Sequence, residues 1–61
     1  MATYVYGVVR DGSHSDVSQT LRGAKTYATR HGYHIVSRRN VNSYNVEVMA
    51  VKNAIGRWEA Q

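Results

Sequence analysis

The stretch 30-RHGYHIVSRR-39 joins two elements of different periodicity and decides the predicted fold. Before Gly32 the apolar residues recur at helical spacing, and after it they alternate as in a strand. Gly32 suits the left-handed conformation that often ends a helix, and Tyr33 is placed to pack back on the last turn. The stretch therefore predicts a helix that ends at Gly32 and a strand that follows at once.

The helix is expected to begin near Val17, with Ser15 or Asp16 as its N-cap, or with a capping box that pairs Ser13 and Asp16. A stripe of residues three and four positions apart should face the core. This stripe consists of Val17, Leu21, Ala24, Ala28 and His31. Polar and basic residues occupy the opposite side, so one face of the helix is buried and the other is wet.

Three further segments have strand character. They are residues 3–10 (TYVYGVVR), residues 44–52 (YNVEVMAVK) and, as a candidate short fourth strand, residues 57–60 (RWEA). Turn-forming residues separate them, in DGSHS at 11–15, NVNS at 40–43 and NAIG at 53–56. The order along the chain is thus strand, helix, strand, strand.

These elements predict an α+β fold, with residues 1–61 forming a single β-α-β-β domain in which one helix packs on one face of a three-stranded sheet. A right-handed crossover makes the second strand parallel to the first, and a tight turn makes the third antiparallel to the second. Two strand orders remain. We prefer insertion of the third strand between the other two; the sequential order is more natural if RWEA pairs with the third strand.

One helix covers only one face of such a sheet. We assign to the covered side Val5, Val9, Ile35, Val46, Val48 and Ala50, with Gly7 allowing close approach of the helix. The other side is also apolar, which is typical of an interaction surface. It carries His34 and the predicted interface residues Tyr4, Tyr6, Val8, Val36, Met49 and Val51. Tyrosines could stack on single-stranded bases there, but the aliphatic content favours a homo-oligomer or protein partner.

The chain is basic, with eight Lys and Arg against four Asp and Glu and a formal net charge of +4. Such a charge favours nucleic acid as a partner, although it also serves to keep a small domain soluble. The expected phosphate contacts, which would not read sequence, are Arg38 and Arg39 first, then Arg30, Lys25 and Arg22.

Catalysis, metals and cofactors are not expected. His31 and His34 lie on either side of the change from helix to strand, and there is no cysteine to complete a zinc site. The segment RDGSHSD at 10–16 contains Ser, His and Asp, but a catalytic triad needs these groups to converge from separate elements. We therefore expect a non-enzyme without cofactor, metal site or small-molecule substrate.

The first apolar run, before Arg10, is too short for a signal peptide core or a membrane span. No membrane association is expected, and the lack of cysteine leaves the cytoplasm as the default location. The predicted function is that of a small non-enzymatic accessory protein that binds nucleic acid through its basic surface and forms homo-oligomers. The alternative is a protein-protein interaction module, either a homodimer or an inhibitor-type domain, with no nucleic-acid role.

Overall fold

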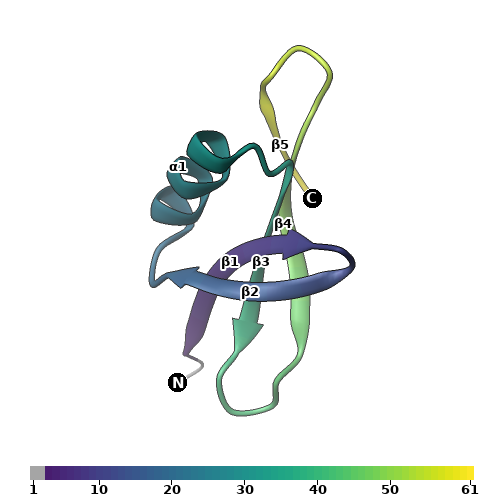
Figure 1. The fold of residues 1–61 in the computed structure, drawn as a ribbon. Helices are drawn as coiled ribbons and strands as arrows, with labels where there is room; N and C mark the ends of the chain where they lie inside the picture. The colour runs from purple at the N-terminus through teal and green to yellow at the C-terminus, as the bar shows by residue number, and fades with distance from the viewer. Residues whose placement is uncertain (1–2) are drawn as a thin grey trace.

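The structure is a computed structural model that describes residues 3–61; Met1 and Ala2 lie outside the described residues. Within this range the chain forms five strands and one helix (Figure 1). These are β1 (Tyr4–Arg10), β2 (Ser13–Ser18), α1 (Leu21–His31), β3 (Ile35–Asn40), β4 (Val46–Lys52) and β5 (Trp58–Ala60). The broad class is α+β, with more sheet than helix.

All five strands belong to one antiparallel sheet in the order β2-β1-β3-β4-β5. The expected three-stranded β-α-β-β arrangement is therefore wrong. Its preferred order is also wrong, because β3 lies between β1 and β4. The sequential alternative is the order that the β1, β3, β4 and β5 strands follow, and the short C-terminal strand pairs with β4. In Figure 1 the β1-β2 hairpin crosses β3 and β4 at a steep angle, so the sheet is strongly twisted.

The additional strand β2 arises from a two-residue turn. Asp11 and Gly12 have positive φ angles of 52° and 80°, and Arg10 pairs directly with Ser13 across the hairpin. An Asp-Gly pair at positive φ is the typical connection of a tight hairpin, because its twist matches that of the strands. The segment after it is therefore a strand rather than a helix cap. The added reversal makes β3 antiparallel to β1, where a direct crossover would have made them parallel.

Helix α1 begins later than predicted. Thr20 is its N-cap, with its Oγ1 accepting a hydrogen bond of 3.0 Å from the Gly23 backbone N–H. Val17 lies on β2 and reaches the core from the sheet instead. The predicted end of the helix is confirmed: Gly32 adopts a left-handed conformation with φ 79°, and the Tyr33 N–H donates to the Ala28 carbonyl at 2.8 Å.

The core lies between α1 and the sheet. Val8, Ala24, Ala28 and Val36 are buried at its centre. Partly buried side chains surround this centre, namely Tyr6, Val17, Leu21, Tyr33 and Trp58. The two alanines let the helix backbone approach the sheet closely, which leaves a thin core built from small side chains.

The predicted assignment of the two sheet faces is largely reversed. Val8 pairs with Val36 and Val36 pairs with Ala50, so these three side chains share the face that α1 covers. The register shifts between Val36 and Ser37, so Val48 points to the opposite face from Ala50 although both were expected together. Alternation alone could not decide the faces, because both are apolar.

Across residues 3–61, no helix is long and apolar enough to cross a membrane.

Candidate nucleic-acid interface

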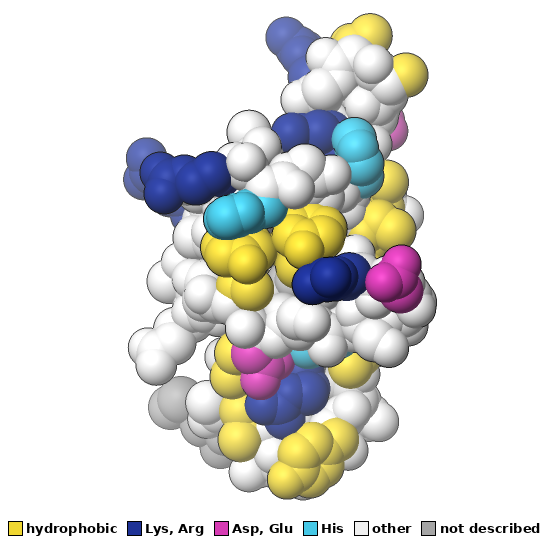
Figure 2. Space-filling model, in the orientation of Figure 1, with side chains coloured by type: hydrophobic (Ala, Val, Ile, Leu, Met, Phe, Trp, Pro, Cys, Tyr) yellow, Lys and Arg dark blue, Asp and Glu magenta, His cyan; other side chains and the backbone are white. Residues whose placement is uncertain are grey.

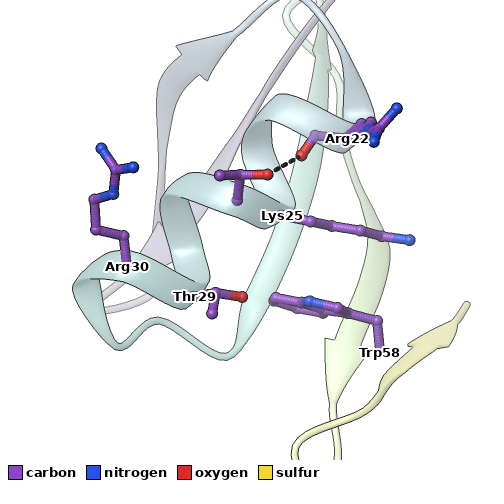
Figure 3. Close-up of a pocket in the computed structure, with 6 residues that line it drawn as sticks. Arg22, Lys25, Thr29, Arg30 and Trp58 are labelled. Atoms are coloured by element: carbon purple, nitrogen blue, oxygen red, sulfur yellow. Dashed lines mark hydrogen bonds between the residues drawn. The ribbon is translucent and has the colours of Figure 1, made fainter.

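A groove of about 480 Å³ lies between α1 and β5 (Figure 3). Its lining consists of Arg22, Lys25, Thr26, Thr29, Arg30 and Trp58. Three of these side chains are cationic, two carry hydroxyl groups, one is an indole, and none is acidic. A positive groove with an aromatic wall suits an anionic ligand that also has a flat apolar part.

The helix supplies all of the groove cations. Arg22, Lys25 and Thr29 follow one another at spacings of three and four, so they form a stripe beside the buried one. The Thr26 hydroxyl donates to the Arg22 carbonyl at 3.0 Å and so faces back along the helix. Figure 3 shows Arg22 and Lys25 extending to the side of the helix where Trp58 lies, whereas Arg30 extends to the other side. Arg22 and Lys25 are therefore the cations best placed beside the ring.

Trp58 is held in place from three directions. Its backbone pairs with Lys52 across the β4-β5 ladder, and its side chain packs against the edge of the core. The Lys52 ammonium group lies 5.1 Å from the indole centroid, within cation-π range, and donates to the Thr29 hydroxyl at 3.2 Å. These contacts fix the ring at the groove wall while leaving it partly exposed.

Arg38 lies outside this groove and has partners of its own. Its Nη2 is 3.3 Å from both carboxylate oxygens of Glu47, and its guanidinium carbon lies 3.9 Å above the Tyr4 ring. Burial alone lowers the pKa of Arg38, but the Glu47 carboxylate and the Tyr6 hydroxyl outweigh it and raise that pKa above its ordinary value. A phosphate would have to displace Glu47 to pair with this side chain.

Arg39 is similarly occupied, on the opposite face of β3. It donates to the two carboxylate oxygens of Asp16 at 2.7 and 3.3 Å, and it lies 5.3 Å from the Tyr44 ring centroid. The hydrogen bonds from Arg39 lower the pKa of Asp16, and those to Asp16 raise the pKa of Arg39. The two arginines that the sequence ranked first are thus separated and ion-paired, while the helix cations share one groove.

Lys and Arg side chains do not form one continuous basic patch on the face drawn in Figure 2. They appear at several separate places along the molecule, and acidic side chains lie among them. The groove between α1 and β5 is therefore set apart by its lining and not by the overall distribution of charge.

A polar network connects β2 to β3 on the face away from the helix. His14 Nδ1 lies 2.5 Å from Ser37 Oγ, and His14 Nε2 lies 2.5 Å from Asp16 Oδ1. His14 and Asp16, which were expected in a turn and a helix cap, are both on β2. Hydrogen bonds link Ser37 to His14 and His14 to Asp16, as in a catalytic triad, but Ser37 is 0% exposed. Because a nucleophile must reach its substrate, this arrangement is suited to joining strands and not to acyl transfer.

The predicted interface residues do not form one exposed surface. Val8 and Val36 are 2% and 0% exposed beneath α1, which corrects their expected position on the open face. Tyr4 lies under the Arg38 guanidinium, and Tyr6 packs against the core. Met49 and Val51 are half-buried on β4.

The face that α1 leaves uncovered carries residues that were expected to be under the helix. Val46 and Val48 are the most exposed of them, at 48% and 44%. Val5, Val9 and Ile35 accompany them and are half-buried. Val51 is also half-buried on this face, where it was predicted to lie. Gly7 also belongs to this face, where it lies beneath His14 instead of beneath the helix.

His31, the last residue of α1, and His34, in the connection to β3, are both exposed. The predicted place of His31 on the buried stripe of the helix is therefore wrong, and its ring lies 4.3 Å from the Tyr27 ring. Within residues 3–61, no group of three or more His, Cys, Asp or Glu side chains could hold a metal ion.

Sequence reasoning named Arg22, Lys25 and Arg30 but missed Trp58, which lines the same groove. Trp58 lies in a three-residue strand that is too short for a clear periodic pattern. The sequence did contain one signal, the turn residues Asn53 and Gly56. The turn between them reverses the chain after β4, so that the single tryptophan comes back toward the helix.

Comparison of the chain with protein-family models, with curated proteins and with solved structures finds no match.

Proposed function

We propose that this protein is a small cytoplasmic accessory protein, without enzymatic activity, that binds nucleic acid through the groove between α1 and β5. The observation that supports this most is the shared lining of the groove, in which Arg22, Lys25 and Trp58 meet without a carboxylate. Ion-paired Arg38 and Arg39 contribute less to the proposed contact than their position in the sequence indicated.

The physical basis is release of counterions from a charged backbone. Lysine and arginine side chains that neutralise phosphates displace condensed cations, and the resulting affinity does not depend on base sequence. Arg22 and Lys25 provide such charges on one turn of a rigid helix. Arg guanidinium groups add bidentate hydrogen bonds to phosphate oxygens.

The test compares two double variants in an oligonucleotide titration at several salt concentrations, beginning at about 50 mM. Arg22→Ala with Lys25→Ala should weaken binding and reduce the slope of log affinity against log salt by about 0.7 for each single-strand phosphate that is no longer neutralised. Arg38→Ala with Arg39→Ala serves as the control of equal charge change, and it should reduce binding less. Absence of binding by the wild type, or equal weakening in both variants, contradicts the proposal.

A second candidate function is protein association through the uncovered sheet face, by a second copy of the chain or by another protein. The exposed Val46 and Val48 side chains support it, because apolar side chains on a sheet face are stabilised when another surface removes them from water. The two functions are compatible, since the groove and this face lie on opposite sides of the sheet.

A further inference from the structure

We propose that the groove selects single-stranded nucleic acid, by stacking one unpaired base on the Trp58 indole while Arg22 and Lys25 hold the adjoining phosphates. This inference rests on the proposed function. It adds that the nucleic acid is single-stranded and that the Trp58 indole distinguishes it from a duplex. The geometry that carries it is the placement in one groove of an aromatic ring and two cations that form no ion pair with any residue in the range 3–61.

Stacking requires a base whose face is accessible. In a duplex each base is covered above and below by its neighbours, so a protein can reach only its edges and the backbone. In a single strand the face is free, and an aromatic side chain can take the place of a neighbouring base. An aromatic ring at the wall of a basic groove therefore favours the single strand over the duplex.

The Trp58 ring is already fixed before any ligand binds. Core packing and the Lys52 contact hold it, and Lys52 is not one of the groove-lining residues. In Figure 3 the Lys25 side chain extends alongside the ring, which places an ammonium group near the edge of a stacked base. A ring that is ordered in advance loses little conformational freedom on binding, which favours affinity.

The size of the groove fits one nucleotide unit better than an extended surface. Its volume of about 480 Å³ is within the range of small-ligand sites, about 300 to 1,000 Å³. The Thr29 hydroxyl lies between helix and ring and adds a polar group next to the indole. A peptide of Asp and Glu alone would satisfy Arg22 and Lys25 but would offer no flat ring to cover Trp58.

Trp58 is the single tryptophan of the chain, so its fluorescence reports on the groove without a label or a variant. Three probes should be compared on the wild type: a single-stranded oligonucleotide of about ten nucleotides, a duplex of the same length, and inorganic polyphosphate. We expect saturable quenching with the single strand, weaker binding of the duplex, and polyphosphate binding without quenching.

A pair of variants tests the role of the ring by anisotropy of a labelled strand. Trp58→Leu should lower single-strand affinity roughly 5- to 140-fold, as expected when one base no longer stacks, while leaving duplex affinity nearly unchanged. Trp58→Phe keeps a ring and should retain more of the affinity. Circular dichroism checks that both variants keep the wild-type secondary structure. If a variant does not fold, the fluorescence comparison on the wild-type protein still tests the inference.

The outcomes separate this inference from the function on which it rests. Equal binding of single strand and duplex without quenching overturns base stacking but leaves phosphate binding in place. Quenching by polyphosphate, or by polyglutamate, to the same extent as by the single strand also overturns it, because no base would then be needed. Failure of every nucleic-acid probe at low salt overturns the proposed function itself.

Discussion

Gly7 on β1 and Ser15 on β2 approach so closely that a Cβ atom built on Gly7 would overlap the Ser15 carbonyl group. The same atom would lie 2.9 Å from Cε1 of His14. Gly7 is thus required by the neighbouring strand and by the imidazole above it. This close approach allows His14 to reach across β1 to Ser37 on β3.

Gly7→Ala should therefore destabilise the protein by about 1 to 3 kcal/mol or more, because the clash involves backbone and cannot be relieved by a side-chain rotation. Urea unfolding followed by circular dichroism measures the change. Ser13→Ala, at an exposed position of the same hairpin, should stay within about 0.5 kcal/mol of the wild type. Equal stability of Gly7→Ala and wild type would show that β1 and β2 are further apart than described.

Ser37→Ala tests the buried end of the network. The substitution leaves His14 Nδ1 without its partner in a nearly closed environment, since the His14 side chain is only 5% exposed. An unsatisfied buried polar group costs about 1 to 3 kcal/mol, and the unfolding free energy should fall by that amount. Ser43→Ala in the exposed β3-β4 connection is the control. A neutral effect of Ser37→Ala would remove the network as a source of stability.

The Asp16 ion pair predicts a dependence of stability on acid. Arg39 and His14 both face the Asp16 carboxylate, and hydrogen bonding by Arg39 holds its pKa below the ordinary 3.8. Because the folded-state pKa is the lower one, this contribution is present above about pH 4 and is lost as the pH falls through the folded-state pKa.

Thermal unfolding at a series of pH values below 5 tests this dependence. Asp16→Asn should reduce the unfolding temperature at neutral pH and flatten its decline below about pH 4 relative to the wild type. Asp11→Asn removes an exposed turn carboxylate and is the control. Parallel pH profiles for Asp16→Asn and the wild type would contradict the coupling.

The two sheet faces can be distinguished by a matched pair of charge substitutions. Val36→Glu places a carboxylate in the core and should unfold the protein, because a buried unpaired charge costs several kcal/mol and a domain of this size has little to spare. Val48→Glu should remain folded, since Val48 is 44% exposed. Circular dichroism of the two proteins gives the comparison. A folded Val36→Glu protein would refute the assignment of the covered face.

The Val48→Glu variant also tests association through the uncovered face. Light scattering of the wild type over a range of concentrations should show a species larger than the monomer if copies associate there, and Val48→Glu should shift it toward the monomer. Thr26→Glu, an equal charge change at the groove on the other side, is the control. A wild type that stays monomeric at high concentration eliminates the second copy as the occupant.

Local signals in the sequence were sufficient for several elements. The end of α1 at Gly32 followed from the residue that tolerates positive φ, and β3 and β4 followed from their alternation. The basic side of the helix followed from its spacing. Asp11-Gly12 is an equally local signal for a hairpin. The following SHSDVS lacks the apolar alternation of a strand, and its Ser and Asp residues are typical of turns and helix caps, so the segment was predicted to be a turn and a cap instead of a strand.

The amino-acid order alone was therefore enough to predict the helix end, the helix stripe centred on Ala24 and Ala28, and the basic residues on the other side of the helix, because each depends on residues close together in the chain. The sheet face that the helix covers depends on the folded arrangement, since both faces are apolar and a register shift at Val36 and Ser37 changes the phase of β4. The folded arrangement also brings Trp58 to Arg22 and Lys25 while carboxylates engage Arg38 and Arg39. Those pairings join residues far apart in the chain, and their energies depend on distances that no local pattern contains.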